Sequence, residues 1–462
     1  MATRKVILDS DIVKLRDVTP DAKGNHPLVA VLFWGDEVTI TGKKAGQDVV
    51  RLFRRIFDEG TRKYRREAVD CLLPKDVEFR TKPLLKVRFI DVGQGDGAII
   101  ESPKGRLVLV DGGEESHMRR YLNAAFSQEL VRNPIHCEAI VITHGDADHF
   151  AGLTDLALAS RHGDGGDPMI TAERVFHNGI AKGPGASLGK TSKVGNRKFV
   201  VGLHDDIRDV PDGQLNEPFK KWKAALSALR TKAGRKTASR RLVYGDDDAF
   251  DFLNDEGIAT SVLGPVPETV QGKDALPWLG DAGKTINGHS IVLKMTYGNV
   301  RILFGADLNE PSEERLLAKT TQTGISLAAE ILKVPHHGSA DFSPRMLEAI
   351  RPVVSVVSSG DESGAKEYIH PRAGLVGALG KYSRGTVERP LIYVTEMVAF
   401  FQRDKGSFRK YTKITYGIVH VRTDGERVLV VTNSGKTDQK EAYAFSVNAR
   451  GETAFEEKVK PI

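Results

Sequence analysis

The sequence predicts an α/β protein in which two β-sheets pack face to face with helices outside them, preceded by a small β-rich module. The length of 462 residues exceeds one ordinary hydrophobic core, which predicts two or three domains. The pattern changes near residue 84, where short apolar runs with glycine-containing turns give way to alternating strands and helices with β-rich meanders between them. Such alternation is typical of layered sheets that helices cover.

Residues 1–82 are predicted to form the β-rich module. Apolar runs at residues 28–33 and 38–41 flank Gly35, which indicates two strands around a tight turn, and residues 49–57 form a strand or a short helix. Short strands with such turns favour a small β-barrel or a sheet extension that could bind a protein partner. A basic cluster provides either a nucleic-acid face or an ordinary solvated surface. The cluster consists of Arg51, Arg54, Arg55, Arg62, Lys63, Arg65 and Arg66.

Residues 83–435 are predicted to be the main domain, because apolar runs and 3.6-residue periodicity recur along them. The predicted strands are residues 85–90, 98–100, 107–110, 139–142, 290–295, 301–304, 329–334, 353–357, 417–425 and 428–431. The predicted helices are residues 117–130, 313–319 and 344–350, with another that begins near residue 151. The polar residues 436–462 are predicted to be a peripheral tail.

One loop concentrates the polar chemistry of the chain. His144, Asp146, Asp148 and His149 lie within six residues, between the apolar residues 139–142 and the start of a helix. A packed core would have to desolvate all four side chains at a large cost in free energy. Imidazole and carboxylate groups crowded into one turn are instead typical of divalent metal sites, so the loop predicts a metal centre.

The spacing His-x-Asp-x-Asp-His resembles the metal loop of the metallo-β-lactamase superfamily, whose common form is His-x-His-x-Asp-His. The form with aspartate at the second position is similar to the soluble hydrolase domain of the DNA-uptake channel protein ComEC and its free-standing relatives. Other segments follow in the order of that family over about residues 85–430. They are residues 91–96 (DVGQGD), 109–113 (LVDGG), 287–290 (NGHS), 304–307 (FGAD), 333–339 (KVPHHGS) and 370–371 (HP).

This resemblance implies an αββα sandwich and a centre of two divalent ions. The implied ligands are His144 and Asp146 for the first ion, Asp148 and His149 for the second, Asp307 as a bridge, and His337 as the last ligand. His289 falls where many superfamily members place a further imidazole. The ComEC-like pattern relies on the asparagine and serine there, so we do not expect His289 to bind metal.

The candidate catalytic residues are Asp148, His336 and His370. His336 would contact metal or the scissile phosphate, whereas His370 would donate a proton, contact substrate or simply cap a helix. The residues expected to support the ligands are Asp111, Asp96, Asn287 and Ser290. In the family the aspartate matching Asp111 hydrogen-bonds to the metal loop; a simple turn before two glycines is the alternative. Lys333 would bind a phosphate oxygen or end its strand in solvent.

Asp146 in place of a second imidazole affects which metal is expected. A carboxylate adds anionic oxygen and removes a softer nitrogen, which favours Mn²⁺ or Mg²⁺, although no ligand excludes Zn²⁺. Two such ions would hold a hydroxide between them and neutralise charge during phosphoryl transfer.

Residues 161–280 are the least family-like part and are predicted to be a basic insert. The lysines and arginines from Lys220 to Arg241 occur with no acidic residue between them, and Trp222 lies among them. A basic helix with an aromatic side chain suits a nucleic-acid surface, and a solvated insert is the alternative. The candidate nucleic-acid contacts are Lys220, Lys221, Lys223, Arg235, Lys236, Arg240 and Arg241. Residues 183–198, rich in glycine, serine and lysine, are expected to form a mobile loop over the active site.

These features favour a metal-dependent phosphodiesterase that acts on DNA or RNA, in keeping with a net charge of +6 and a pI near 9.0. A hydrolase of lactones, lactams, thioesters or cyclic nucleotides is the alternative, because fold does not determine substrate. A binding module with structural metals is disfavoured by the open water position that this ligand set implies. With two cysteines, no apolar run of about 20 residues and no secretory signal, we expect a cytoplasmic protein without a membrane partner.

Overall fold

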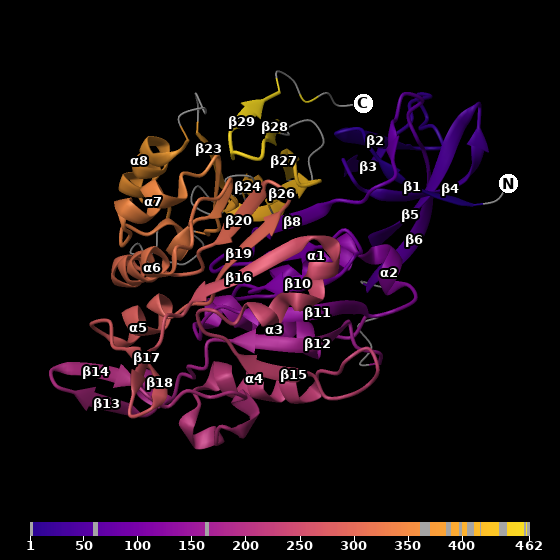
Figure 1. Cartoon of the computed structure of the whole chain (residues 1–462). Coiled ribbons are helices and arrows are strands. Elements are labelled where there is room, and N and C mark those ends of the chain that lie inside the picture. The colour runs from indigo at the N-terminus through magenta and orange to yellow at the C-terminus, as the bar shows by residue number, and fades with distance from the viewer. Residues whose placement is uncertain are drawn as a thin grey trace.

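The computed structural model describes most of the chain. The described residues are 3–58, 63–161, 166–360, 370–384, 390–396, 400–403, 411–415, 417–433, 441–456 and 459. Two large β-sheets lie at the centre, with a β-rich module at the N-terminal end (Figure 1). This arrangement confirms the predicted α/β fold with a β-rich N-terminal module.

The N-terminal module is a seven-stranded sheet. Its strands in spatial order are β3 (Leu28–Phe33), β2 (Ile12–Asp17), β6 (Lys63–Leu72), β5 (Gln47–Asp58), β4 (Glu37–Lys44), β1 (Arg4–Leu8) and β7 (Phe79–Arg80). Residues 49–57, for which the sequence left two alternatives, belong to the strand β5. Leu8, Val13, Leu15 and Val50 are fully buried in the module's own core. Antiparallel strands with one face buried explain the alternating pattern of this part of the sequence.

Hydrogen bonds connect the module to the rest of the protein. Arg422 donates hydrogen bonds to the carbonyls of Phe33 and Trp34, at 3.1 and 2.7 Å, and to Asp36 Oδ1 at 2.8 Å. Arg66 of the predicted basic cluster donates to Asn123 Oδ1 at 2.7 Å. The same cluster includes Arg51, which pairs with Asp70, and Arg62, which lies outside the described residues.

The first central sheet has ten strands. In spatial order they are β15 (Ala238–Arg241), β12 (Ile170–His177), β11 (Ile135–Ile142), β10 (Leu107–Val110), β9 (Ala98–Glu101), β8 (Leu85–Ile90), β26 (Ile418–Thr423), β27 (Arg427–Asn433), β28 (Ala442–Val447) and β29 (Thr453–Phe455). Strands β10, β11, β12 and β15 are parallel to one another. Parallel strands covered on both faces require continuous apolar runs such as Leu107–Val110, which is buried throughout.

The second central sheet has six strands. In spatial order they are β16 (Ile258–Gly264), β19 (Val292–Tyr297), β20 (Val300–Phe304), β21 (Ile331–Lys333), β22 (Val354–Val357) and β23 (Leu391–Val394). One continuous core joins the facing sides of the two sheets. In it the rings of Phe89 on β8 and Phe304 on β20 lie 5.9 Å apart between centroids. The two sheets therefore form the expected sandwich.

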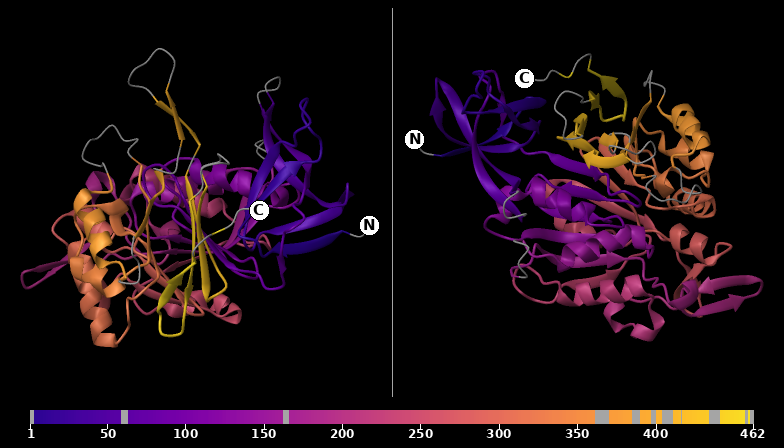
Figure 2. Two further views of the ribbon diagram at one scale, coloured as in Figure 1. Left: turned by 90° about the horizontal axis from the view of Figure 1, so that it is seen from above. Right: turned by 180° about the vertical axis from the view of Figure 1, so that it is seen from behind.

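Helices cover the outer faces of this sandwich (Figures 1 and 2). They are α1 (His117–Ala125), α2 (Ser127–Leu130), α3 (Ala147–Leu158) and α4 (Glu217–Ala228) on the ten-stranded sheet, and α6 (Glu310–Thr323), α7 (Pro344–Ile350) and α8 (Ala373–Tyr382) on the six-stranded sheet. The short α5 (Ala282–Gly288) precedes β19. Across the described residues no helix is both long and apolar enough for a membrane span.

Two of the predicted segments contain strands of the central sheets. Within residues 161–280, β12 and β15 extend the ten-stranded sheet and β16 belongs to the six-stranded sheet. Within residues 436–462, β28 and β29 continue the ten-stranded sheet, and Phe445 is buried.

A small four-stranded sheet projects beside α5 (Figure 1). It consists of β13 (Thr191–Val194), β14 (Arg197–Val200), β18 (Lys273–Pro277) and β17 (Glu268–Val270). Residues 183–198, predicted as a loop, instead contribute a β-hairpin to this sheet, which we call the wing. Val200 and Leu276 of the wing pack against Ile286 of α5, which anchors it to the main body. A separate hairpin, β24 (Phe400–Arg403) and β25 (Tyr411–Thr415), lies near the C-terminal strands.

Candidate metal centre

The predicted ligands meet where loops from both central sheets converge. The loop after β11 carries His144, the first turn of α3 carries His149, and the loop after β20 carries Asp307. His337 lies in a short 3₁₀ turn that follows β21. Because β20 and β21 run parallel, the segments that follow them leave the sheet at the same edge, opposite the loop of the first sheet. The sandwich therefore brings together residues separated by nearly two hundred positions in the sequence.

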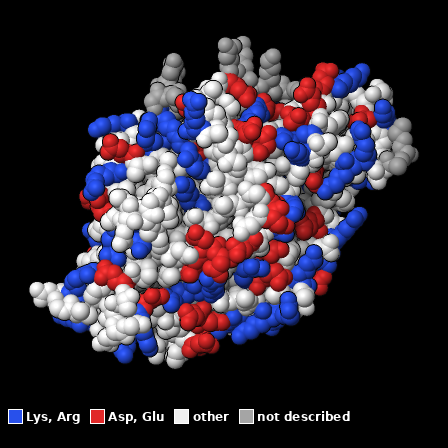
Figure 3. Space-filling view, in the orientation of Figure 1, with Lys and Arg blue, Asp and Glu red and all other residues white. Residues whose placement is uncertain are grey.

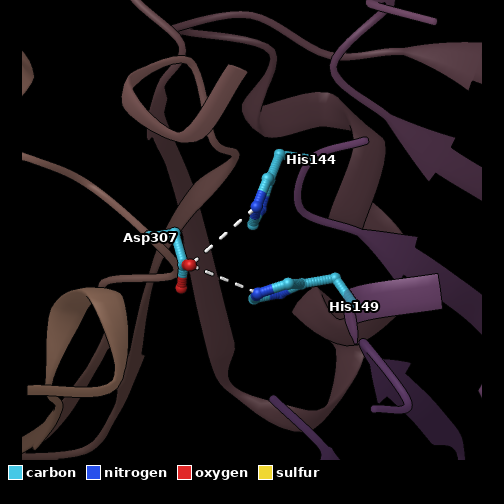
Figure 4. A group of neighbouring side chains, drawn as sticks. All are labelled: His144, His149 and Asp307. Carbon is cyan, nitrogen blue, oxygen red and sulfur yellow. Dashed lines mark ion pairs between the residues drawn. The ribbon is translucent and has the colours of Figure 1, made fainter. Parts of the chain in front are cut away.

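Three imidazoles surround the carboxylate of Asp307. Its Oδ2 lies 3.1 Å from His337 Nε2, 3.3 Å from His149 Nε2 and 3.9 Å from His144 Nε2. Figure 4 shows the rings of His144 and His149 directed at this carboxylate. Asp148, in the first turn of α3, adds a second carboxylate, with its Oδ2 3.8 Å from His337 Nε2. Five of the six predicted ligands thus have donor atoms close together.

Buried polar atoms at this point lack hydrogen-bond partners among the described residues. They are the Nε2 atoms of His144, His149 and His337 and the Oδ1 atom of Asp307. Leaving such atoms unsatisfied is costly, whereas a divalent cation would satisfy all of them. The groups His144–His149–Asp307 and Asp148–His149–His337 each offer ligand atoms within 4.8 Å of one another. The residues therefore fit divalent metal, with nitrogen and oxygen ligands of the kind that zinc and manganese accept.

Asp111 contacts the metal loop through hydrogen bonds, as the family pattern implied. Its Oδ1 accepts a hydrogen bond from Thr143 N at 2.8 Å, and its Oδ2 accepts one from Thr143 Oγ1 at 2.7 Å. The same Oδ2 lies 2.8 Å from His149 Nδ1. A carboxylate that accepts from Nδ1–H leaves Nε2 free to face a metal. Asp111 is therefore more than the turn-forming residue of the alternative interpretation.

Hydrogen-bonding partners also orient the ring of His337, which follows a strand of the second sheet. Its Nδ1 lies 3.0 Å from the carbonyl of Ser358 and 3.3 Å from Asp96 Oδ1. Asp96 in turn contacts the ammonium of Lys333, which also donates to the carbonyl of Ala306 at 3.0 Å. Lys333 is 4% exposed, so it supports Asp96 from inside the protein. The alternative that Lys333 lies in solvent is therefore wrong, and its ammonium is paired with Asp96.

Asn287 and Ser290 also lie beside the cluster. Ser290 Oγ accepts from the backbone N–H of Asp307 at 3.3 Å and donates to the carbonyl of Asn287 at 2.7 Å. The Asn287 amide lies 3.2 Å from His336 Nε2. The rings of His336 and His370 are 6.5 Å apart between centroids. These side chains form a polar border next to the ligands.

His289 is not among the converging side chains. Its Nε2 lies 2.7 Å from the carbonyl of Pro277, and the residue is 1% exposed. This position agrees with the expectation that the asparagine and serine of the segment, and not its histidine, serve the site.

Asp146 is the one predicted ligand that belongs to none of the close groups. Its Oδ2 lies 3.9 Å from His144 Nε2, while its Oδ1 contacts the ammonium of Lys182. Lys182 was not among the residues predicted from the sequence. No local pattern could have identified it, because the lysine lies 36 positions away and reaches Asp146 only through the tertiary fold.

The exposed fractions of these side chains locate the opening of the site. The side chains of His144, Asp307 and His337 are 0 to 4% exposed, whereas those of Asp146, Asp148 and Lys182 are 21 to 23% exposed. His336 and His370 are also partly exposed, so solvent reaches the cluster between these side chains.

The charges of the cluster strongly affect one another. Burial lowers the pKa of His144 well below its usual value, and the neighbouring His149 adds to this effect. Although burial opposes it, the carboxylates of Asp307 and Asp96 raise the pKa of His337 to about 10. Asp307 and Asp111 likewise raise the pKa of His149 against burial. Protons on these imidazoles occupy the positions that a metal needs, so metal and protons compete for the site.

Glycine is required where the first motif approaches the metal loop. A Cβ on Gly95 would lie 1.7 Å from the carbonyl oxygen of Asp148, and the φ angle of Gly95 is +100°. Both the backbone conformation and the lack of space exclude a larger residue. The glycines of residues 91–96 therefore allow Asp96 to pass beneath α3 and reach His337.

The candidate nucleic-acid residues are partly neutralised by acids from other segments. Lys220 pairs with Glu217, Lys223 with Asp212, Arg240 with Asp248, and Arg241 with Asp205 and Asp274. Lys221, Arg235 and Lys236 are exposed. Figure 3 shows basic and acidic side chains interspersed over one face of the molecule. The expectation that these residues form a surface of unopposed positive charge is thus only partly met.

Trp222, proposed as an aromatic contact, is buried. It is 3% exposed, and its ring lies 6.5 Å from that of Phe150 on α3. A tryptophan in this position cannot stack on a base, so its predicted role is wrong. Its spacing from Phe219 and Leu226 on α4 instead serves to pack that helix against α3.

Comparison with known proteins agrees with this geometry. The family model described as Metallo-beta-lactamase superfamily matches residues 90–358. The chain belongs to the metallo-β-lactamase superfamily. The matched region begins at the end of β8 and includes the metal loop, Asp307 and His337. Members of this superfamily normally bind divalent metal ions, in keeping with the cluster of histidines and aspartates.

No curated protein matches the chain. Among solved structures, a mutant of CmlA beta-hydroxylase is similar, with a TM-score of 0.30 and 13% sequence identity. The similarity covers 68% of this chain and 53% of that one, so the chain spans about half the length of that structure.

Proposed function

We propose that this metallo-β-lactamase superfamily protein is a metal-dependent phosphodiesterase that cleaves DNA or RNA. The observation that carries the proposal is the convergence of three imidazoles and Asp148 on the buried carboxylate of Asp307, with an opening on one side. Such a constellation suits the activation of water for hydrolysis, and it exceeds what a structural metal would need.

Each residue of the centre has a separate role in this proposal. Asp148, His149, His337 and Asp307 would hold one divalent ion, and His144 with Asp146 would complete a second position beside Asp307. When bound, the ions supply a water of lowered pKa and neutralise charge on the phosphate. Asp111 keeps Nε2 of His149 directed into the site, and Asp96 with Ser358 does the same for His337.

The polar border would bind the substrate. Asn287 and His336 lie next to the ligands, within hydrogen-bonding distance of each other, and His370 follows on the far side of His336. Burial, together with the charges of His337 and His336, lowers the pKa of His370 to about 4. The ring is then neutral at pH 7, which favours a role as a hydrogen-bonding contact to substrate over that of an imidazolium proton donor.

The basic residues in and next to the wing favour a polyanionic substrate. From Lys182 to His204 the chain has basic residues and no acidic ones. The basic residues are Lys182, Lys190, Lys193, Arg197 and Lys198. Lys182 lies at the opening of the site, Lys190 and Lys193 are exposed, and Arg197 pairs with Glu268. Cations that extend outward from a metal centre attract a phosphate backbone through the release of its counterions.

The second candidate is a hydrolase of small molecules such as lactones, lactams, thioesters or cyclic nucleotides. The ion pairs of Lys220, Lys223 and Arg240 favour it, because they remove positive charge that a long polyanion would need. The same metal-bound water could attack these smaller substrates.

A substrate panel tests the proposal. Purified protein is loaded with Mn²⁺, Mg²⁺ or Zn²⁺ and offered single- and double-stranded DNA, RNA, cyclic dinucleotides and a chromogenic lactam. We expect metal-dependent cleavage of a nucleic acid that His149→Ala abolishes, because that substitution removes a ligand common to both close groups. Cleavage of small substrates alone would refute the nuclease assignment and support the second candidate.

We also propose a cytoplasmic location. The support is that Cys71 and Cys137 are both buried free thiols, as expected in a reducing compartment.

A further inference from the structure

The two halves of the metal centre are unequally built. On one side of the centre Asp148, His149 and His337 form a close group, and Asp307 Oδ2 lies 3.1 Å from His337 Nε2 and 3.3 Å from His149 Nε2. On the other side, His144 is joined within such distances only by His149 and Asp307 among the described residues. Asp146, which should complete this side, takes part in no close group.

The carboxylate of Asp146 is already occupied by an internal cation. Its Oδ1 contacts Lys182 Nζ, and its Oδ2 remains 3.9 Å from His144 Nε2. Other ion pairs near the centre lie behind the ligands, such as the pair of Lys333 with Asp96. The pair of Lys182 and Asp146 differs because it lies at the opening and uses a carboxylate that a metal would need.

The backbone around Lys182 is held in place by several contacts. Its carbonyl accepts a hydrogen bond from Asn216 N at 2.9 Å, where α4 begins. The preceding Ile180 and Ala181 are buried in two different cores. Asn178 accepts from Ile180 N at 3.1 Å and donates to the carbonyl of His289 at 2.9 Å. The lysine therefore extends from a fixed segment toward Asp146.

No other described side chain replaces Asp146 on this side. His289 falls where many superfamily members place a further imidazole ligand, but its Nε2 lies 2.7 Å from the carbonyl of Pro277. Its backbone carbonyl is held by Asn178, which fixes the residue in that orientation. An ion beside His144 would consequently have to share the carboxylate of Asp146 with the ammonium of Lys182, or bind with fewer ligands.

We propose that Lys182 competes with a divalent ion for Asp146, so that the chain binds one ion firmly and a second ion weakly. The firm ion is held by Asp148, His149, His337 and Asp307, and the weak ion by His144 and Asp146. The ammonium supplies one positive charge where a second ion would bring two, and the two cations repel each other at this distance. The inference rests on the metal centre of the proposed function and specifies how that centre fills.

Metal titration tests this inference without a measurement of turnover. Metal-free protein is titrated with Mn²⁺ by calorimetry, and the bound metal is counted by elemental analysis. The wild type is expected to show one tight binding event and a second event at least about tenfold weaker. Lys182→Met keeps an unbranched side chain without its charge. It should raise the affinity for the second ion about tenfold or more, equivalent to about 1.4 kcal/mol. Lys190→Met, on the same segment, is the control and should leave both events unchanged.

Spin coupling gives a second readout of how the positions fill. At one equivalent of Mn²⁺ the wild type should give the electron paramagnetic resonance signal of isolated ions, and Lys182→Met should give a larger share of coupled pairs. Asp146→Asn provides a further variant if Lys182→Met does not fold: it should lose the second binding event and keep the first.

The outcomes separate the inference from the proposed function. Two equal binding events in the wild type, an unchanged second event in Lys182→Met, or loss of the first event in Asp146→Asn would each overturn the inference and leave a metal centre intact. Absence of any Mn²⁺ or Zn²⁺ binding would overturn the proposed function, and the inference with it.

Discussion

His149 Nδ1 lies 2.8 Å from Asp111 Oδ2, and both side chains are fully buried beneath the metal loop. The contact joins the residue after β10 to the start of α3, because Asp111 directly follows the strand and His149 lies in the first turn of the helix. It determines which ring nitrogen carries the proton and leaves Nε2 directed at Asp307. The orientation of a candidate ligand thus depends on a residue that belongs to a different strand and would not itself contact a metal.

Asp111→Asn is therefore expected to weaken metal binding by about 10- to 100-fold, because the amide no longer fixes the tautomer or adds negative charge. Competition with a chromogenic chelator measures the affinity. Asp209→Asn, at an exposed carboxylate, serves as the control and should retain wild-type affinity. An unaltered affinity in Asp111→Asn would show that His149 needs no such support.

Removal of the metal should abolish turnover and leave the fold intact. The core between the two sheets is built from apolar residues such as Phe89, Val141 and Phe304, and includes none of the ligands. Far-ultraviolet circular dichroism of the chelated protein should match that of the loaded protein. Added Mn²⁺ or Zn²⁺ should raise the melting temperature, since an ion at about 100 times its Kd stabilises the folded state by about 2.7 kcal/mol. His149→Ala should show no such rise; unfolding on chelation would mean that the metal is structural.

Glu313 predicts a pH dependence of stability that is separate from the metal centre. Burial raises the pKa of Glu313 from 4.5 to about 8, and the nearby carboxylates of Asp341, Glu310 and Glu314 act in the same direction. Between these two values the folded state binds more protons than the unfolded state. The free energy of unfolding should therefore fall as pH rises from about 4.5 to about 8, by at most about 1.4 kcal/mol per pH unit.

Denaturant unfolding at several pH values measures this dependence. Glu313→Gln should flatten the profile in that window, because the glutamine cannot ionise. Glu348→Gln, at an exposed position on α7, is expected to leave the profile unchanged. A profile that is equally steep in Glu313→Gln would assign the dependence to other groups.

Charge reversal distinguishes the two candidate nucleic-acid surfaces. Lys190→Glu with Lys193→Glu tests the wing, and Lys221→Glu with Arg235→Glu and Lys236→Glu tests the exposed cations near α4. The variant on the true surface should bind DNA or RNA more weakly and reduce the salt slope by about one for each phosphate that the protein no longer neutralises. Fluorescence anisotropy at several salt concentrations provides both values. Lys75→Glu, on the N-terminal module, is the control; if neither set of substitutions changes the binding, both surfaces are excluded.

Trp222→Ala should destabilise the protein by about 3–5 kcal/mol, because it leaves a cavity between α3 and α4. Chemical denaturation measures the loss, and Trp222→Phe should recover part of it. Lys221→Ala, at the exposed neighbouring position, is expected to change stability by less than about 0.5 kcal/mol. A stable Trp222→Ala protein with weakened nucleic-acid binding would restore the stacking role that its burial argues against.

Much of the fold could be predicted from local patterns. The apolar runs that became β10, β11 and β22 were recognised because parallel strands buried on both faces leave a continuous signal. The sequence does not indicate strand β28, because its exposed tyrosine and serine lie among buried residues and give a polar average. The family pattern predicted a set of ligands, and the structure places Asp307 and His337 of that set beside His149.

By itself the sequence determined the strand pattern, the density of ligands in the metal loop and the order of the motifs, because these depend on residues close together in the chain. Only the tertiary structure decided which charged side chains form ion pairs. It paired Lys182 with Asp146, buried Lys333 against Asp96, and brought Asp248 and Asp274 to Arg240 and Arg241. Coulombic and hydrogen-bond energies depend on distance in space, and in this sandwich the nearest charge is often tens or hundreds of positions away.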